Sequence, residues 1–404
     1  MGPLSGIRVL DLSRAIAGPY GTMVLGDLGA EIIKIEAPEG DMSRLSAGPS
    51  YKGENFYYLA FNRNKKSIVL DLLTKSGKKV FYDLVKISDI VLNNFRAGSM
   101  ERLGADYDTL CKINPRIICC NITGYGHSGP SSQRPAYDIT VLAASGIISV
   151  TGDPDGRLVR PGIPIADEGG ALFAVIGVLA ALAERQNTGK GKRIDVSLMD
   201  SCISLLAYPF SYYFTTNIVP KPFHYSAHPV IVPYGLYKTK KGYVALGVCW
   251  PRVTRAIEAD WLADDPRFKD LKARQEHRDE LGVVIEECLA IAEADEWMEI
   301  FKIEDIPAAK VTTIDEAATD PQVLHQKMIL TLEHPLGGKI KLTGNPVKME
   351  GVSEEEFAPP PTLNQHQHQI LSGLLGYTDE KIRKLREEEK ENTAKRLNHI
   401  QKVL

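Results

Sequence analysis

The chain is organised around one stretch, residues Pro161–Gln186, which reads PGIPIADEGGALFAVIGVLAALAERQ. A proline-bearing approach leads to Asp167, and the apolar run that follows is typical of a long core helix. Asp is preferred at a helix start because its side chain accepts hydrogen bonds from the free N–H groups of the first turn. The helix dipole also favours negative charge there, so we expect Asp167 to be ionised near neutral pH.

This stretch leaves two interpretations of Asp167 open. It either caps a buried helix, or it is a carboxylate nucleophile at the floor of a site. Gly169 and Gly170 follow where helix propensity alone favours Ala, so we expect another backbone or a ligand to come close there. Glu168 is the nearest competing carboxylate, but consecutive helical residues point about 100° apart, so the two cannot share one role.

Length and composition are those of a soluble globular protein. The 404 residues, 44% of them hydrophobic and 25% charged, suggest two or three domains. A formal net charge of −3 argues against general attraction to nucleic acid or an anionic membrane. The N-terminus lacks a signal-peptide pattern, and the longest apolar run, Ala171–Ala183, is too short to span a bilayer. The six cysteines form no C-x-x-C pair, which predicts reduced, buried thiols in a cytoplasmic protein.

The first 125 residues alternate between short apolar strands and helical patterns. The expected strands are Ile7–Leu12, Glu31–Ile35, Ser67–Leu72, Ile90–Phe95 and Arg116–Thr123, and the expected helices are Tyr20–Leu28, Ser76–Lys86 and Met100–Ile113. Such alternation predicts an α/β fold in which helices cover both faces of a parallel sheet. Ligands of such sheets bind beyond the carboxyl ends of the strands.

The composition changes near Ile218, where four prolines occur between residues 219 and 234. A hairpin pattern over Tyr234–Val248 and three helical patterns come next, and short strands return from about Ile329. We therefore predict a large domain over residues 1–217, a linker with a small α+β domain over 218–328, and a C-terminal segment over 329–404.

Polar side chains follow the fourth expected strand in the sequence NNFRAGSMERLG. Asn94, Phe95, Arg96 and Arg102 bring an amide, an aromatic face and two guanidinium groups to one rim of the sheet. Arg suits phosphate because its planar fork binds two oxygens, so this set is suited to a nucleotide with phosphates. Two solvated surface arginines near a helix start are the alternative interpretation.

Two further motifs are not what they first resemble. The loop GYGHSG, Gly124–Gly129, formally matches the dinucleotide fingerprint, but Pro130 and Pro135 follow where that fingerprint requires a helix, so we predict a loop at the rim of the site. His366 and His368 alternate on a polar loop without a further Cys or His nearby, which does not match metal-site spacing. We predict no metal site.

Taken together, the motifs of the chain resemble those of the class III CoA-transferases, the CaiB/BaiF family. The matching motifs are, in order, VLDLS, AGP, LGAEIIKIEAP, NKKSIVLDL, NFRAG, GYGHSGP, the Asp167 stretch, TGKG and HPVIVPY. They cover most of the chain in order, which makes the resemblance far more specific than any one motif.

The resemblance implies transfer of coenzyme A from an acyl-CoA donor to a free carboxylic acid, with Asp167 as the covalent nucleophile and no metal or redox cofactor. It implies a Rossmann-like large domain that binds CoA, to which the C-terminal segment returns, and a homodimer of two interlocked rings. It places around CoA the residues Ala15, Ile16, Leu70, Asn94, Phe95, Arg102 and Tyr137. Arg96 joins this set because it follows the fourth expected strand, at the same rim of the sheet.

Two departures and two alternatives bear on this prediction. Ala97 stands where many members have Pro, and Ser226–Pro233 lacks the glycine run of members that act on formyl-CoA and oxalate, which argues against that substrate pair. An α-methylacyl-CoA racemase shares the fold, but those racemases have His where this chain has Tyr137, and Tyr, with a pKa of about 10, is a poor base. A non-catalytic CoA-binding protein would have no use for Asp167.

Overall fold

The computed structural model describes residues 2–46 and 48–403, and the chain divides into two compact units. Unit 1 consists of Met1–Ala144, Ile163–Leu205 and Gln322–Leu404, and unit 2 consists of Ser145–Gly162 and Leu206–Pro321. Residues 145–162 and 206–217, predicted within the large domain, thus lie in unit 2, where Gly146 approaches the Leu206 side chain.

Unit 1 is built on a six-stranded sheet in the order β5-β2-β1-β6-β7-β8, with every neighbouring pair parallel. The strands are β1 (Arg8–Asp11), β2 (Glu31–Glu36), β5 (Lys65–Val69), β6 (Ile90–Asn93), β7 (Ile118–Thr123) and β8 (Arg193–Ser197). The parallel sheet confirms the predicted α/β class. β5 begins at Lys65 and not at the predicted Ser67. The Lys65 ammonium group is buried 3.0 Å from Asp11 Oδ2, and a strand prediction based on hydrophobic residues does not include a buried lysine.

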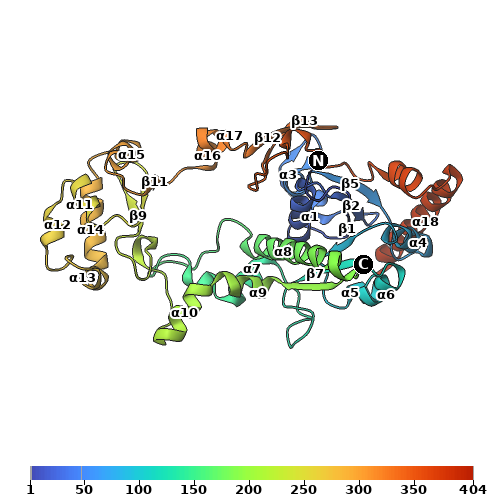
Figure 1. The fold of residues 1–404 in the computed structure, drawn as a ribbon, viewed down its shortest axis with the longest axis horizontal. Helices are drawn as coiled ribbons and strands as arrows, with labels where there is room; N and C mark the ends of the chain where they lie inside the picture. Colours follow the sequence, from blue (N-terminus) through green and yellow to red (C-terminus); the bar gives the residue numbers. More distant parts are fainter. Residues whose placement is uncertain (1, 47, 404) are drawn as a thin grey trace. The chain divides into compact units, whose positions relative to one another are not determined.

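Helices cover both faces of this sheet (Figure 1). One face carries α1 (Ala17–Asp27) and α8 (Ile165–Thr188), and the other carries α4 (Lys75–Val85), α6 (Tyr107–Ile113) and α18 (Asp379–Val403). The single helix predicted over Met100–Ile113 is wrong. It is divided into α5 (Ser99–Leu103) and α6, because Gly104 adopts φ 68° and the Asp106 side chain caps α6 by accepting from the Thr109 N–H.

The apolar helix α8 packs against α1, where a Cβ on Gly21 would lie 3.4 Å from the Ala171 carbonyl oxygen. By length and composition α8 is apolar enough to cross a membrane, but half of its most apolar window is buried inside the protein. A core helix of a water-soluble protein passes the same test. The helix ends at Gly189, whose φ of 68° makes it a left-handed glycine C-cap.

Smaller elements surround the sheet of unit 1. They are α2 (Met42–Leu45), β3 (Ser50–Tyr51), β4 (Glu54–Asn55), α3 (Phe56–Phe61), α7 (Asp138–Ser145), α9 (Leu198–Leu205), β12 (Ile329–His334) and β13 (Gly338–Thr343). The residues between β7 and α7 form no helix, so the loop predicted at Gly124–Gly129 is confirmed.

Unit 2 contains a three-stranded antiparallel sheet in the order β11-β10-β9. Its elements are α10 (Ala207–Thr216), β9 (Gly235–Lys238), β10 (Tyr243–Leu246), α11 (Arg252–Ala256), α12 (Trp261–Asp264), α13 (Leu271–Glu276), α14 (Arg278–Leu289), α15 (Ala294–Ile303), β11 (Ala308–Lys310) and α16 (Ile314–Thr319). The predicted hairpin is confirmed as β9 and β10. The first of the three predicted helical patterns, over Trp250–Ala263, is divided into α11 and α12, because Glu258 adopts φ 55° between them.

All six cysteines are free thiols, in line with the prediction. Four are buried, whereas Cys111 and Cys288 are partly exposed, so the prediction of uniform burial is wrong for these two. Burial raises the pKa of Cys120 to about 12, which makes this thiol unreactive at neutral pH.

Candidate active site

Asp167 is the third residue of α8 and does not cap it, because the helix begins at Ile165. The cap comes from another element. Asp138, the first residue of α7, accepts through Oδ1 from the backbone N–H of Ala166 at 2.9 Å and of Asp167 at 3.4 Å. The predicted capping role of Asp167 is therefore wrong, and its own carboxylate is left available for chemistry.

The surroundings of Asp167 disfavour its charge. Burial, followed by the nearby carboxylates of Asp138 and Glu168, raises the pKa of Asp167 to about 7. Asp167 is therefore only partly ionised at neutral pH, and the prediction that it is ionised there holds in part, because desolvation and like charges oppose the helix dipole. Burial and Asp138 also raise the pKa of Glu168. We call Asp138, Asp167 and Glu168 the crowded carboxylates.

The two glycines after Asp167 make room for protein side chains. A Cβ on Gly170 would lie 2.4 Å from Leu198 Cδ2, and a Cβ on Gly169 would lie 3.1 Å from Leu205 Cδ1. Both leucines belong to α9. The close approach expected at these glycines is made by two leucine side chains and not by a backbone, because the glycines seat α9 against the first turn of α8.

Tyr57 lies within electrostatic reach of the crowded carboxylates. It is the second residue of α3, whose start is capped by Asn55 accepting from the Tyr57 N–H at 2.9 Å. Burial, and then the charges of Asp167 and Asp138, raise the pKa of Tyr57 to about 12. The phenol therefore stays protonated at neutral pH and remains a hydrogen-bond donor.

A pocket of about 210 Å³ lies beyond the carboxyl ends of β1, β2, β5 and β6. Leu70 and Phe95, both predicted, line it together with Arg14, whose guanidinium lies 5.0 Å from the centre of the Phe95 ring. Strand ends of a parallel sheet are where ligands of this architecture bind. An aromatic face and a guanidinium group on one pocket suit a heterocycle that carries phosphates.

Buried ion pairs fix the walls of this pocket. The Lys34 ammonium group contacts Asp41 Oδ2 at 2.8 Å, and both side chains are fully buried. Asp41 Oδ1 accepts from the Ala15 N–H at 3.2 Å and the Ser43 N–H at 2.9 Å. Ala15, a predicted contact residue, adopts φ 62°, a strained conformation for a residue with a Cβ. Asp41 thus ties the loop after β1 to the loop after β2.

The other predicted contact residues are divided between this pocket and its surroundings. Asn94 holds the Arg14 backbone by two hydrogen bonds of 2.8 and 2.7 Å, and Ile16 is buried at the start of α1. Arg96 and Arg102 are exposed, and Arg102 donates to Ser99 Oγ at 2.9 Å. Tyr137, just before α7, is 68% exposed. Arg96, Arg102 and Tyr137 are not among the described residues that line the pocket.

Four residues of these sites were not predicted from the sequence, namely Arg14, Asp41, Tyr57 and Asp138. Arg14 and Asp41 lie in the loops that follow the first two strands, so the strand-end rule applies to them as well as to Asn94. Asp138 precedes an apolar helical segment, which is a helix-start signal. Tyr57 carries no local signal, because its place near Asp167 depends on a contact between distant segments.

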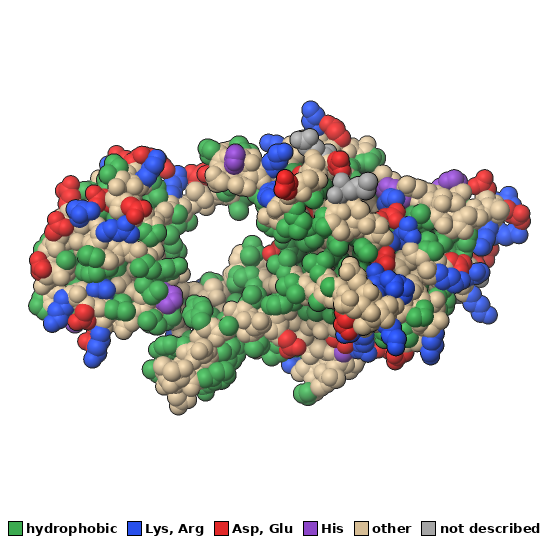
Figure 2. Space-filling model, in the orientation of Figure 1, with side chains coloured by type: hydrophobic (Ala, Val, Ile, Leu, Met, Phe, Trp, Pro, Cys, Tyr) green, Lys and Arg blue, Asp and Glu red, His purple; other side chains and the backbone are tan. Residues whose placement is uncertain are grey.

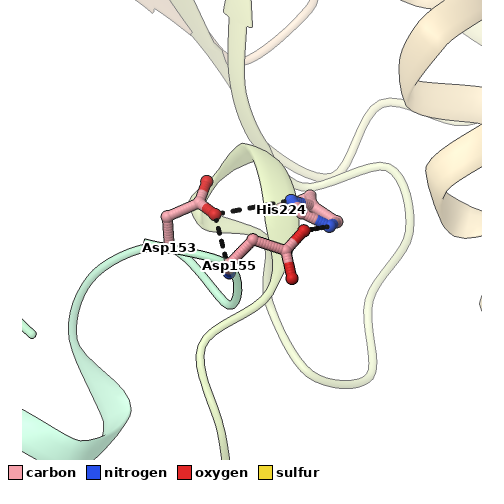
Figure 3. A group of neighbouring side chains, drawn as sticks. All are labelled: Asp153, Asp155 and His224. Carbon is pink, nitrogen blue, oxygen red and sulfur yellow. Dashed lines mark hydrogen bonds and ion pairs between the residues drawn. The ribbon is translucent and has the colours of Figure 1, made fainter. Parts of the chain in front are cut away.

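Three potential metal ligands meet in unit 2, namely Asp153, Asp155 and His224 (Figure 3). His224 Nδ1 lies 3.7 Å from Asp153 Oδ1, and its Nε2 lies 3.3 Å from Asp155 Oδ2. One ligand atom from each residue lies within 4.8 Å of the others, and each carboxylate is nearest to a different ring nitrogen of His224. Both carboxylates are exposed, and we assign no metal to the trio.

The two histidines of the C-terminal loop have separate partners. His366 Nδ1 accepts from the Ser67 N–H at 3.1 Å, and the His366 N–H donates to the Ser67 carbonyl at 2.9 Å, which extends the edge of β5. His368 Nε2 lies 3.3 Å from Asp379 at the start of α18. The two side chains thus stabilise the return of the C-terminal segment to unit 1.

Comparison with known proteins identifies the family. The family model CoA-transferase family III matches residues 4–367. The chain belongs to this family. It is 36% identical over 388 residues to the human succinyl-CoA:glutarate CoA-transferase, a match covering 95% of this chain and 88% of that protein. An acetyl-CoA:oxalate CoA-transferase of Acetobacter aceti is 35% identical over 367 residues, covering 89% of this chain and 92% of that protein.

Solved structures agree with this assignment. The crystal structure of a CaiB/BaiF family protein from Brucella suis superimposes with a TM-score of 0.83 at 33% identity, covering 92% of this chain and 99% of that one. The resemblance stated from the motifs is confirmed, and so is the transferase class. For a family III CoA-transferase the substrates are an acyl-CoA and a carboxylic acid.

Proposed function

We propose that the chain transfers CoA from an acyl-CoA donor to a free carboxylic acid through a covalent intermediate on Asp167. The observation that carries this proposal is the raised pKa of Asp167, about 7, caused by burial and by Asp138 and Glu168. A carboxylate held where its charge is disfavoured gains most when that charge is removed, and acylation removes it. Near neutral pH a large fraction of Asp167 is still ionised and able to attack.

The proposed reaction has two exchanges. The Asp167 carboxylate attacks the thioester carbonyl of the donor, the carbon–sulfur bond breaks, and a mixed anhydride and a CoA thiolate form. The thiolate then attacks the Asp167 carbonyl carbon, which releases the donor acid as a carboxylate and leaves an aspartyl-CoA thioester. The acceptor carboxylate repeats these steps in reverse. Both intermediates hydrolyse in water, so the partial burial of Asp167 limits this side reaction.

Tyr57 supports the negative charge that develops in these steps. Its raised pKa keeps the phenol protonated, and a neutral donor near a developing oxyanion stabilises it without an added charge. Asp138 holds the first turn of α8 and so orients the Asp167 backbone. This chemistry requires no metal or redox cofactor, and CoA takes part only as substrate.

We assign the nucleotide part of CoA to the pocket lined by Arg14, Leu70 and Phe95. Ala15, Ile16 and Asn94 shape the adjoining loop, and the exposed guanidinium groups of Arg96 and Arg102 are available for phosphate. Tyr137 directly precedes Asp138, and its exposed ring remains a proposed contact of the acyl-CoA. For the acid we propose short dicarboxylates, because the relatives act on glutarate and oxalate.

We further propose a cytoplasmic homodimer with no nucleic-acid or membrane partner. This rests on the family resemblance and on the exposed apolar side chains of α8, among them Leu172 at 46% and Ile176 at 59%. An apolar row of this kind on a folded protein indicates a covered surface. Sedimentation at low concentration that finds a stable, active monomer would contradict the dimer.

One experiment separates the candidate activities. The chain is mixed with succinyl-CoA and with glutarate, oxalate or mesaconate, and the CoA species are resolved by mass. A new acyl-CoA is the expected result and indicates a transferase. Loss of optical purity in a chiral 2-methylacyl-CoA without new species would indicate a racemase, and no change in either assay would indicate a non-catalytic CoA-binding protein.

A further inference from the structure

Three neighbouring strands of unit 1 carry a chain of polar side chains across the sheet, toward their carboxyl ends. Asn93 is the last residue of β6, Asn121 lies opposite it on β7, and Asp195 lies opposite Asn121 on β8. Asn93 Nδ2 donates to Asn121 Oδ1 at 2.7 Å, and Asn121 Nδ2 donates to Asp195 Oδ1 at 2.9 Å. We call these three residues the polar ladder.

The two amides of the polar ladder are buried on an otherwise apolar face of the sheet. Asn93 and Asn121 are 2% and 7% exposed, whereas charged side chains are spread over the surface of unit 1 (Figure 2). Two positions earlier on the same strands, Val91 and Cys119 belong to the apolar core. A buried amide lowers stability unless its hydrogen bonds are made. Apolar side chains fill such a face without this requirement, so packing alone does not explain the two amides.

The two ends of the polar ladder fix the orientation of both amides. At one end, the backbone N–H of Phe95 donates to Asn93 Oδ1 at 3.2 Å. At the other end, the Asp195 carboxylate has only acceptor oxygens, so Asn121 turns its NH2 group toward it. Every donor therefore points from Phe95 toward the carboxylate. Hydrogen bonds aligned in one direction polarise and strengthen one another.

Two basic side chains hold the carboxylate end of the polar ladder. Arg193 Nε contacts Asp195 Oδ2 at 2.8 Å, and His127 Nε2 lies 3.8 Å from Asp195 Oδ1. His127 belongs to the loop Gly124–Gly129, which follows β7. The polar ladder thus connects the loop after β7 to the loop after β6, where Phe95 lies.

The other end of the polar ladder lies at the pocket of unit 1. Phe95 lines that pocket, and the centre of its ring lies 5.0 Å from the Arg14 guanidinium group. The hydrogen bond from the Phe95 N–H to the side chain two residues earlier closes a tight turn, of the kind that Asn commonly forms. This turn sets the direction in which the chain leaves β6, and so it sets the place of the Phe95 ring.

We propose that Asn93 and Asn121 are positioning residues for CoA, which act by holding the Phe95 backbone so that the Phe95 ring lies on the wall of the pocket. The inference rests on the proposed function, because that function assigns the nucleotide part of CoA to this pocket. A ring that is fixed before the ligand arrives loses little freedom on binding, so the polar ladder raises the affinity for CoA through Phe95.

A purely structural ladder is the competing interpretation. In that case the loss of a ladder residue lowers stability, and the affinity for CoA follows the stability in every variant. The positioning role predicts that the affinity follows the hydrogen bond of the Phe95 N–H, whatever happens to the stability. Two substitutions of Asn93 separate these interpretations.

The test compares the two Asn93 variants in the full chain, with the affinity for CoA measured by calorimetry. Asn93→Ala removes the acceptor of the Phe95 N–H, and we expect CoA to bind roughly tenfold more weakly. It should raise the KM for succinyl-CoA by a similar factor and leave kcat unchanged. Asn93→Asp keeps an acceptor for that N–H but buries a carboxyl group in place of the NH2 donor to Asn121. It should be less stable in denaturant titration and still recover most of the affinity.

Asn121→Ala tests whether the hydrogen bonds act as one chain. We expect CoA to bind roughly threefold more weakly, because Asn93 keeps its bond to the Phe95 N–H but loses the partner that fixes its amide. Combining Asn121→Ala with Asn93→Ala should weaken binding no further than Asn93→Ala alone, since groups of one network act non-additively.

Asn114→Ala is the matched control. The Asn114 side chain makes three hydrogen bonds just before β7, at the opposite end of the strands. Its loss should lower the stability, and the affinity for CoA should stay at the wild-type value. A weakened affinity in this control would show that CoA binding follows stability in general, which would overturn the inference.

Phe95→Ala distinguishes a failure of this inference from a failure of the proposed function. Weaker CoA binding in Phe95→Ala together with unchanged binding in Asn93→Ala would overturn the inference alone. So would equally weak binding in Asn93→Asp and Asn93→Ala, or multiplied effects in the double variant. Unchanged binding in Phe95→Ala would overturn both the assignment of CoA to the pocket and this inference. Absence of any new acyl-CoA with the wild type would contradict the transfer reaction, and calorimetry would still test the polar ladder.

Discussion

Unit 1 contains two groups of carboxylates whose surroundings act in opposite directions. Asp11, Glu36 and Asp41, the paired carboxylates, contact Lys65, Arg44 and Lys34 at 3.0, 2.8 and 2.8 Å. Burial alone would raise the pKa of each, but the adjacent cations and hydrogen bonds outweigh it and lower all three. The crowded carboxylates have burial and like charges, and the pKa values of Asp167 and Glu168 are raised.

The paired carboxylates therefore have a structural role, whereas Asp167 has a chemical one. The paired carboxylates are satisfied, and they fix loops around the pocket of unit 1. Asp167 is held in a state whose charge is disfavoured, which costs stability and supplies reactivity. If this is correct, substitutions in the two groups should have opposite effects on stability and distinct effects on activity.

Asp167→Asn should give the largest effect on activity and the clearest contrast in stability. Transfer should fall by at least about 10³-fold, because an amide cannot attack the thioester. Since the folded pKa is raised to about 7, the wild type loses stability as pH rises from about 4 to 7. The Asn variant avoids this loss and should be more stable at pH 8 by on the order of 2 kcal/mol and similar at low pH. A less stable variant at pH 8 would contradict the crowding of these carboxylates.

Asp41→Ala should act in the opposite direction. Removing one partner of a buried pair leaves the Lys34 charge uncompensated, so unfolding should become easier by about 3–5 kcal/mol. Because the pKa of Asp41 is lowered, its stabilisation is present above pH ~4 and is lost as pH falls further. Glu276→Ala, which breaks the exposed 3.9 Å pair with Lys272, is the control and should cost under about 1 kcal/mol in denaturant titration. Equal losses of unfolding free energy in the two variants would contradict the structural role of Asp41.

Asp138→Asn tests the crowded carboxylates, because it removes one negative charge and keeps an oxygen that can cap α8. In the wild type, kcat/KM for the donor should rise through an apparent pKa near 7, since Asp167 must be ionised to attack. The variant should move this acid limb to lower pH by roughly one unit. Asp138→Ala should add a loss of about 1 kcal/mol from the missing cap. An acid limb that stays in place in Asp138→Asn would show that Asp138 does not influence the titration.

Arg102→Ala should have the smallest of these effects. The exposed guanidinium is proposed to contact a phosphate of CoA, so CoA affinity should fall roughly tenfold, while acylation of Asp167 at saturating donor should be unchanged. Folding should be unaffected, because the exposed Arg102 side chain makes one side-chain hydrogen bond among the described residues, to Ser99 Oγ. Unchanged CoA affinity by calorimetry would remove Arg102 from the site.

Local patterns in the sequence predicted the sheet well. Apolar runs such as Ile90–Phe95 lie in strands because both faces of a parallel sheet are buried. The start of β5 was predicted too late, because Lys65 is buried through a pair with Asp11, which is 54 residues away in the chain. The break between α5 and α6 at Gly104 was not predicted, because it requires a residue in the left-handed conformation and the apolar periodicity continues across it.

The site was predicted only in part for a similar reason. Asp167, Leu70 and Phe95 lie beside apolar elements with clear boundaries, and the family motifs include them. The capping of α8 by Asp138 joins residues 28 positions apart, and the pKa of Asp167 is raised first by its burial in the fold and then by the charge of this same Asp138. A property that depends on distant segments meeting is absent from any local window, so the ionisation state of the nucleophile required the fold.

The covalent role of Asp167 is tested most directly by trapping. Wild-type protein is incubated with succinyl-CoA and then with hydroxylamine, which converts an activated carboxyl group into a hydroxamate, and the peptides are resolved by mass. We predict the mass change on Asp167 alone, with none in Asp167→Asn and none without succinyl-CoA. Label on Glu168 or Asp138 in place of Asp167, or transfer activity without any label, would contradict the account.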